Sequence, residues 1–442
     1  MRAAHLAAVL TLVGAASAQA AGYALKEEST DAMGSAYAGA AASEKDASYL
    51  IYNPASLDGV EDWDASVSGI GIFIDSNARY PTALTSAGSP TGGTQTPNSF
   101  VSNALIPEFG LRKRLSPQWS IGLVASAPWG LITHYPTDWA GRYYAEYTKL
   151  MTINATPTVA FEVSPQLTLG AGLQIEYAKG KLGTAIDIGT LGTLAGIPGA
   201  MPGRQDGFAH LDGDGWATGF TLGAIAKPTP DLALGLSYRS KIDHTLDGSL
   251  NFNLDSAGLG ALIRSATGLF ADTQASAKIP MPDEVSFGGR EAFSDRWAGL
   301  FEVDWTNWSL LHQLRIVAAN PAQPPDVTVL NWHDAWFGSV GLEYHHDERW
   351  TFRFGTAYDQ SPTPDATREP RVPDADRIWL AAGASYRWSD STEIELSAGH
   401  LFDLSSSVAL SASQTGNQFR GTLIGTTNSA INVVGLQINY RY

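Results

Sequence analysis

The sequence of 442 residues contains no cysteine, and this absence removes several chemistries at once. Disulfide bonds, thiolate catalysis and cysteine-based metal sites are all excluded. Charged residues make up only 16% of the chain, and 44 acidic residues against 28 basic ones give a net charge of −16. A nucleic-acid-binding surface needs clustered Lys and Arg, so this balance argues against that class of function.

Long apolar runs are missing after the N-terminus, where no stretch approaches the roughly 18 apolar residues of a membrane-spanning helix. At the N-terminus itself, residues 3–16 form an apolar run that is followed by Ala18-Gln19-Ala20. This arrangement is typical of a secretory signal peptide, and it predicts one over residues 1–20. We therefore expect the mature chain to leave the cytoplasm.

An apolar period of two is present from about Trp63 onward. Residues 151–163 alternate apolar with polar or small side chains, and residues 167–177 repeat the pattern after Ser164-Pro165-Gln166. Successive side chains of a strand point to opposite faces, so each segment has one apolar face. Segments of about ten residues have the length of tilted strands that cross a bilayer.

The connections between these segments alternate in length. Short turns lie at residues 116–118, 164–166, 227–231, 294–296, 345–349 and 389–391. Long connections lie at residues 76–103, 129–149, 179–215, 243–275, 306–334, 359–376 and 401–430. This alternation is typical of an outer-membrane barrel, with short periplasmic turns and long extracellular loops. The segments predict an all-β transmembrane barrel of about fourteen antiparallel strands.

A soluble all-β sandwich is the alternative fold, because one strand alone does not show which way its apolar face looks. The polar faces are rich in Gly, Ser, Thr and charges, which suits a wet lumen. Aromatic residues such as Trp119, Trp297 and Trp350 collect near the segment ends, as they do at membrane interfaces. Both features favour the barrel.

Residues 21–62 precede the first predicted strand and lack its period. Small residues dominate positions 27–42, and Asn53-Pro54-Ala55 follows in an extended or turn geometry. A loose periplasmic tail would carry more charge, so we favour a lumenal hatch with short helices. The predicted organisation is a signal peptide (1–20), a hatch (21–62) and a barrel (63–442).

Several short motifs occur in a distinctive order along the chain. They are Ala21-Gly22-Tyr23, residues 34–39, Asp46-Ala47, Asn53-Pro54-Ala55, and residues 210–213, 305–308, 350–355, 359–364 and 372–377. In order and spacing they resemble the long-chain fatty acid outer-membrane transporter family (FadL-type). The resemblance implies a fourteen-strand barrel plugged by an N-terminal hatch, located in the outer membrane of a Gram-negative type of cell.

The resemblance also implies sideways release of hydrophobic molecules through a gap in the barrel wall. A kinked third strand makes this gap in the family, and the hatch turn Asn53-Pro54-Ala55 is expected against it. Here the third strand is predicted over residues 119–127, followed by Pro128-Trp129-Gly130. Pro cannot donate to a strand ladder, so a break is plausible there, although Pro128 could instead simply end the strand.

Substrate-binding residues are likewise implied by the resemblance. Lys179 and Arg315 align with basic residues of the family's pocket, where a buried carboxylate needs a cation. Tyr23 is the candidate that blocks the pocket until the N-terminus moves. The extracellular capture groove is expected at apolar residues with helical spacing, namely Leu259, Leu262 and Ile263.

No nucleotide-binding loop, zinc-protease motif or nucleophile elbow occurs in the sequence. Asp212-Gly213-Asp214-Gly215 lacks the closing Glu of a calcium loop, and His345-His346 lies in a short turn. We therefore predict no catalytic residue, metal or cofactor. The expected function is passive uptake of long-chain fatty acids or similar hydrophobic compounds by a monomer embedded in outer-membrane lipid. A channel for aromatic hydrocarbons and a general diffusion porin are the alternatives.

Overall fold

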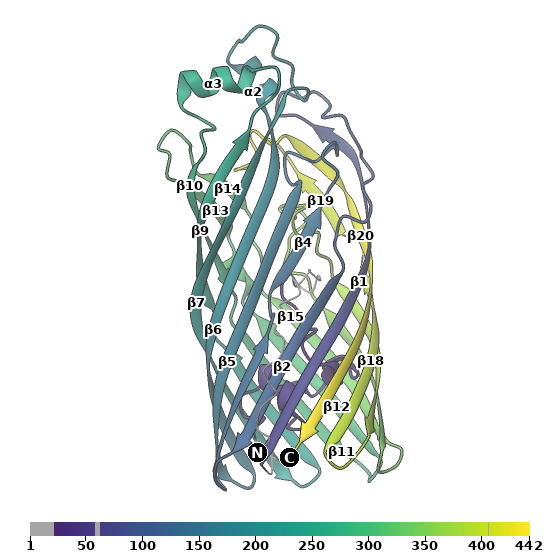
Figure 1. Cartoon of the computed structure of the whole chain (residues 1–442). Coiled ribbons are helices and arrows are strands. Elements are labelled where there is room, and N and C mark those ends of the chain that lie inside the picture. Colours follow the sequence, from purple (N-terminus) through teal and green to yellow (C-terminus); the bar gives the residue numbers. More distant parts are fainter. Residues whose placement is uncertain (1–21, 58–61, 405) are drawn as a thin grey trace, which may run out of the picture.

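A computed structural model describes residues 22–57, 62–404 and 406–442, so the predicted signal peptide lies outside the described residues. Every strand belongs to one antiparallel sheet, which closes because β1 pairs with β2 on one side and with β20 on the other. Consecutive pieces such as β3 and β4, or β8 and β9, continue one another, so the closed wall has 14 strands (Figure 1). The predicted fold class is confirmed.

The strands differ greatly in length. They are β1 (Trp63–Leu84), β2 (Ala104–Arg114), β3 (Trp119–Ser126), β4 (Gly130–His134), β5 (Tyr147–Ser164), β6 (Leu167–Asp187), β7 (Asp206–Thr229), β8 (Leu232–Arg239), β9 (Ile242–Asn253), β10 (Thr273–Met281), β11 (Glu284–Ala292), β12 (Trp297–Thr306), β13 (Gln313–Ala318), β14 (Asp326–Val329), β15 (Ala335–His345), β16 (Trp350–Asp359), β17 (Arg377–Arg387), β18 (Thr392–Asp403), β19 (Ser406–Leu410) and β20 (Thr422–Arg441).

Helices are few and short. They are α1 (Thr30–Met33), η1 (Ala40–Ala42), η2 (Ala47–Ile51), α2 (Ile188–Leu194), α3 (Leu259–Thr267) and η3 (Trp308–Leu310). Within the described part of the chain, none of them combines the length and apolar character needed to cross a membrane. Helices α2 and α3 lie at the top of the barrel in Figure 1.

The wall turns its apolar side chains outward. On β20, Val434, Leu436 and Ile438 are about half exposed, whereas Gln437 and Asn439, at alternate positions, are buried. This is the strand alternation that the sequence predicts, with polar side chains facing the lumen. Outward apolar faces around a polar interior are the reverse of a soluble sandwich and match a lipid-facing wall.

Backbone pairing extends further than the apolar pattern indicates. About half of the connection predicted over residues 179–215 is strand, because β6 continues to Asp187 and β7 begins at Asp206. The connection predicted over residues 76–103 likewise begins only after Leu84. Apolar alternation marks the part of a strand that faces an apolar surrounding, whereas backbone hydrogen bonds need no particular side chain.

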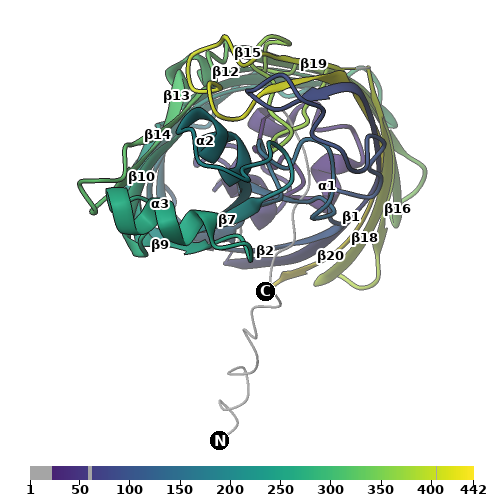
Figure 2. The same cartoon turned by 90° about the horizontal axis from the view of Figure 1, so that it is seen from above.

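The segment from Gly22 to Leu57 lies inside the barrel. Seen from above, the ring of strands encloses α1 and the rest of this purple segment (Figure 2), and nearly all its residues are buried. Ion pairs attach it to the wall: Asp31 contacts Arg353 at 2.5 Å, and Lys45 contacts Glu393 at 2.7 Å. The lumen is therefore filled by the chain's own N-terminal residues, which we call the hatch.

Glycines in the wall allow this close packing. A Cβ added to Gly355 of β16 would lie 1.9 Å from the carbonyl oxygen of Ser35, and one at Gly170 of β6 would lie 2.3 Å from the carbonyl carbon of Pro54. The hatch backbone thus lies directly against the wall where the wall carries no side chain. A methyl group at either position would push the hatch inward.

We expect Gly355→Ala to loosen the hatch, since overpacking of this kind costs about 1–3 kcal/mol. Tryptic cleavage at Lys45 in the folded, detergent-purified protein should become about tenfold faster. Gly338→Ala on β15 is the matched control, because a Cβ there meets nothing within 4 Å. Equal cleavage rates in the two variants would contradict this packing.

Candidate functional site

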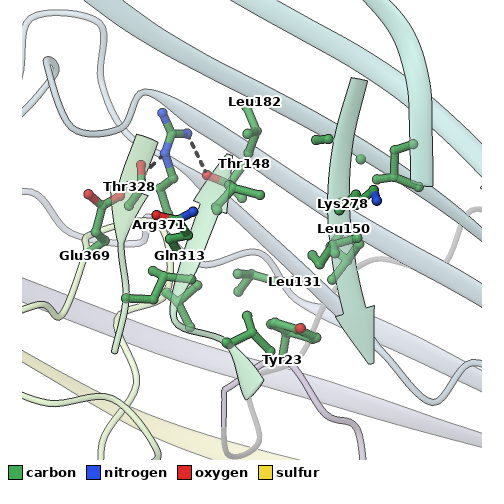
Figure 3. Close-up of a pocket in the computed structure, with 18 of the residues that line it drawn as sticks. Tyr23, Leu131, Thr148, Leu150, Leu182, Lys278, Gln313, Thr328, Glu369 and Arg371 are labelled. Carbon is green, nitrogen blue, oxygen red and sulfur yellow. Dashed lines mark hydrogen bonds and ion pairs between the residues drawn. The ribbon is translucent and has the colours of Figure 1, made fainter. Parts of the chain in front are cut away.

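An apolar cavity with an empty volume of about 1030 Å³, its mouth included, lies within the barrel (Figure 3). The apolar lining comes from the wall and the loops and includes Leu131, Leu150, Leu182, Leu211, Leu246 and Trp332. Such a surface favours an apolar ligand without demanding a particular shape.

Tyr23 of the hatch lines this cavity. Its ring lies 4.8 Å from that of Trp308 and 5.7 Å from that of Trp332, measured between centroids. The hydroxyl donates a hydrogen bond of 2.9 Å to the carbonyl of Pro280, so the polar end of the side chain is satisfied. Tyr23 is only 3% exposed and forms a packed aromatic boundary of the cavity.

The wall is interrupted at Pro128. Strands β3 and β4 both pair with β5, where Ser126 faces Asn154 and Gly130 faces Met151. Three residues, 127–129, separate β3 from β4, whereas only two residues, 152 and 153, separate their partners on β5. The extra residue makes a bulge, and the strand resumes after Pro128 rather than ending there.

The same interruption leaves an edge of β2 open toward β3. Pairing between β2 and β3 begins at Phe109, so the described strand pairings of residues 104–108 lie only on the β1 side. Inside this position, Leu25 N–H donates to the Pro128 carbonyl and Gly130 N–H donates to the Tyr23 carbonyl, each over 2.9 Å. Residues 23–25 therefore pair with the broken strand from the lumenal side.

Two carboxyl groups follow directly in the hatch. Glu27 and Glu28 are 0% and 3% exposed, and burial raises the pKa of each to about 7. Arg377 lowers the pKa of Glu27 and Arg239 lowers that of Glu28, but burial is the larger effect for both. These groups are neutral below about pH 7 and acquire buried charge above it.

The structure does not place Lys179 or Arg315 at this cavity. Gly180 and Leu182 of β6 line it, so Lys179 takes the opposite face of the strand, where its ammonium group lies 3.6 Å from Asp212. Arg315 on β13 is exposed and is absent from the lining as well. Alternation along each strand turns both side chains away from the lumen.

Arg371 is the buried basic residue that the cavity does contain, and sequence reasoning missed it. It is 9% exposed and directly precedes the motif over residues 372–377. That motif indicated the family but gave no reason to expect its loop inside the lumen. Only the folded chain brings Arg371 beside Thr148 of β5 (Figure 3).

The predicted loop residues lie elsewhere. Leu259 and Ile263 of α3 are buried in a small apolar cluster, whereas Leu262 is 52% exposed. A second, outer cavity with an empty volume of about 1570 Å³ lies beside this cluster and includes Leu191 and Phe270 in its lining. The three leucine and isoleucine residues therefore belong to the extracellular end and do not line the inner cavity.

The hatch turn at Asn53 does not lie against the break in the wall. Asn53 donates to the carbonyl of Ala224 on β7 over 3.2 Å, and Pro54 lies against Gly170 of β6. Tyr23 and Leu25 instead make the hydrogen bonds to Gly130 and Pro128 at the break. Leu57, just after the turn, packs lower on the third strand, beside Val124.

Comparisons with known proteins agree over nearly the whole chain. Residues 11–442 match the family described as outer membrane protein transport protein (OMPP1/FadL/TodX). The long-chain fatty acid transport protein of Escherichia coli O6:H1 is 28% identical over 401 residues, covering 87% of each chain. Outer membrane protein P1 of Haemophilus influenzae is 25% identical and covers 99% of this chain and 98% of its own.

Solved structures give the same picture of the fold. The crystal structure of a Pseudomonas aeruginosa FadL homologue superposes with a TM-score of 0.87 at 26% identity, covering 95% of this chain and 100% of that one. The Ralstonia pickettii toluene transporter TbuX has a TM-score of 0.64 at 20% identity, covering 94% and 98%. At 20% identity, the similarity to TbuX shows a shared fold only.

The raised pKa values predict that the hatch loosens as pH rises. An acid whose folded pKa lies above its ordinary value favours the buried position at low pH, and this preference is lost between about pH 4.5 and pH 7. We compare tryptic cleavage at Lys45 in the wild type and in the E27Q/E28Q double variant at each pH, which cancels the pH dependence of trypsin. The cleavage rate of the wild type divided by that of the double variant should be near one at pH 5 and roughly five at pH 8, because only the wild type acquires buried charge. A constant ratio would contradict the assignment.

Proposed function

This chain belongs to the outer membrane protein transport protein (OMPP1/FadL/TodX) family, and we propose that long-chain fatty acids are its cargo. As a member of this family it is an outer-membrane β-barrel that transports hydrophobic compounds, and it is not an enzyme. We further propose that the cargo enters from the extracellular loops and leaves sideways through the wall.

One observation carries the proposal: residues 23–25 cover the break at Pro128 while Tyr23 also lines the apolar cavity. The same segment thus separates the cavity from the open edge of β2. Movement of the N-terminal residues would join the cavity to the bilayer in a single step. Tyr23 is therefore the proposed gate. Pro128, Trp129 and Gly130 are the wall residues against which its segment closes.

The chemistry of the cavity suits an acyl chain. Each buried methylene contributes about 0.8 kcal/mol, so a long chain gains on the order of 10 kcal/mol from an apolar lining. Two relatives named as long-chain fatty acid transport proteins are 28% and 26% identical to this chain. The toluene transporter is 20% identical.

Aromatic hydrocarbons are the second candidate cargo, and a specific observation favours them. Tyr23 and Trp332 line one end of the cavity and pack with Trp129 and Trp308, in a cluster whose contacting ring centroids are 4.8–6.0 Å apart. Edge-to-face packing of this kind accommodates another ring readily. A general diffusion porin is disfavoured, because the hatch fills the lumen that ions would cross.

The proposed extracellular path begins near α3. The outer cavity lies beside the cluster of Leu259 and Ile263, and the exposed Leu262 offers an apolar contact on the same helix. Exposed apolar side chains of this kind are suited to weak initial capture. The turn Asn53-Pro54-Ala55 is proposed to anchor the hatch to β6 and β7 while residues 23–25 move.

Deletion of Pro128 tests both the cargo and the route. Removing one residue leaves two residues between β3 and β4, the same number as between their partners on β5. We therefore expect a continuous strand and a closed wall. Uptake of radiolabelled oleate by liposomes that contain the purified protein should fall to the protein-free rate, while surface binding of oleate is retained. Pro128→Ala is the matched control, because it keeps the extra residue and should keep uptake.

Two results would contradict the proposal. Oleate uptake that persists after the deletion would exclude the lateral route. Toluene uptake by the wild type without any oleate uptake would assign the protein to aromatic hydrocarbons instead.

A further inference from the structure

We propose that Arg371 binds the carboxylate of the cargo at the junction of the outer and inner cavities, and so selects fatty acids over neutral hydrocarbons. This inference rests on the proposed function and names the side chain that would recognise the acid. It replaces the head-group role that the family resemblance implied for Lys179 and Arg315.

The position of Arg371 is the first argument. The inner and outer cavities share part of their lining, and the shared residues are Leu182, Leu211, Leu314, Thr328 and Arg371. Arg371 is the only charged residue among them. Any molecule that moves from the outer cavity to the inner one therefore passes this guanidinium group.

The hydrogen bonds of Arg371 are the second argument. Its Nη1 donates to the carbonyls of Tyr147 and Gly183 and to the hydroxyl of Thr148, each over 3.3 Å. These three hydrogen bonds are long. Among the described residues, no atom accepts a hydrogen bond from Nη2 of Arg371. A guanidinium has five N–H donors in a planar fork that matches a carboxylate, so donors remain for a ligand.

The nearest acids are already engaged by another arginine. Arg420 contacts Glu369 at 3.0 Å and Asp326 at 2.7 Å, whereas Arg371 is 3.8 Å from Glu369. These carboxylates raise the pKa of Arg420, while burial lowers that of Arg371. Arg371 is therefore a buried cation with incomplete compensation, a state that an incoming carboxylate relieves.

Two other basic residues touch the inner cavity but point away from it. Lys149 stands between the buried Thr148 and Leu150 on β5, and Lys278 follows the buried Ala277 on β10. Alternation places both ammonium groups toward the outer face.

This arrangement orients the cargo. Arg371 lies at the upper left of the drawn lining and Tyr23 at its lower edge, with Leu131 between them (Figure 3). A carboxylate held by Arg371 leaves the acyl tail to extend along leucine side chains toward the aromatic boundary. The tail then lies against the segment that covers the break in the wall.

Ligands with the same tail and different head groups test the inference. We compare the Kd of oleate and of oleyl alcohol for the purified full chain in lipid nanodiscs by equilibrium binding of radiolabelled ligand. Arg371→Gln should weaken oleate binding about tenfold or more and change oleyl alcohol binding less than about twofold. Arg371→Lys should recover part of the oleate affinity, and Arg315→Gln, the matched exposed control, should change neither.

Three results would overturn the inference. Oleate binding that is unchanged in Arg371→Gln would show that the guanidinium does not meet the acid. Equal loss of both ligands in Arg371→Gln and Arg371→Lys would assign Arg371 a structural role. A wild type that binds neither ligand would overturn the proposed function itself, a failure visible before any substitution is made.

Discussion

Backbone hydrogen bonding in a bilayer is the constraint on which the structure depends. Hydrocarbon offers no partner to a free N–H or C=O group, so a wall that crosses it must close on itself. This wall closes through β1 and β20 but is interrupted at Pro128, where part of β2 has no described strand partner toward β3. The N-terminal residues form hydrogen bonds with Pro128 and Gly130 at that point, which couples the hatch to the break in the wall.

The polar interior follows from the same constraint. With apolar side chains turned to the lipid, the alternate positions of each strand face inward, and many of them carry polar or charged groups. Several of these pair with the hatch, as Arg353 does with Asp31 and Glu393 with Lys45, and such ion pairs hold the hatch in place. Arg371 differs because its loop enters the lumen and brings a cation beside an apolar cavity, where its nearest ion-pair partner, Glu369, is 3.8 Å away and also contacts Arg420.

Much of the fold was predictable from residues with a two-residue period, because lipid imposes that period on segments such as 151–163. The site was less predictable. Lys179 and Gly180 are neighbours in sequence, yet alternation turns one outward and places the other in the lining. A resemblance aligns positions but does not fix this register. Arg371 lies in an irregular loop, where no period predicts which way the chain runs, and only tertiary contacts reveal its role.

The most direct test of the account is a reversible lock between the N-terminal segment and the broken strand. Ala24 and Trp129 are paired across this contact, and the chain has no cysteine of its own, so A24C/W129C introduces a single disulfide. Oxidation should stop oleate uptake into liposomes, and a reductant should restore it. Equal uptake by the oxidised and reduced forms would show that the cargo does not leave by way of this segment.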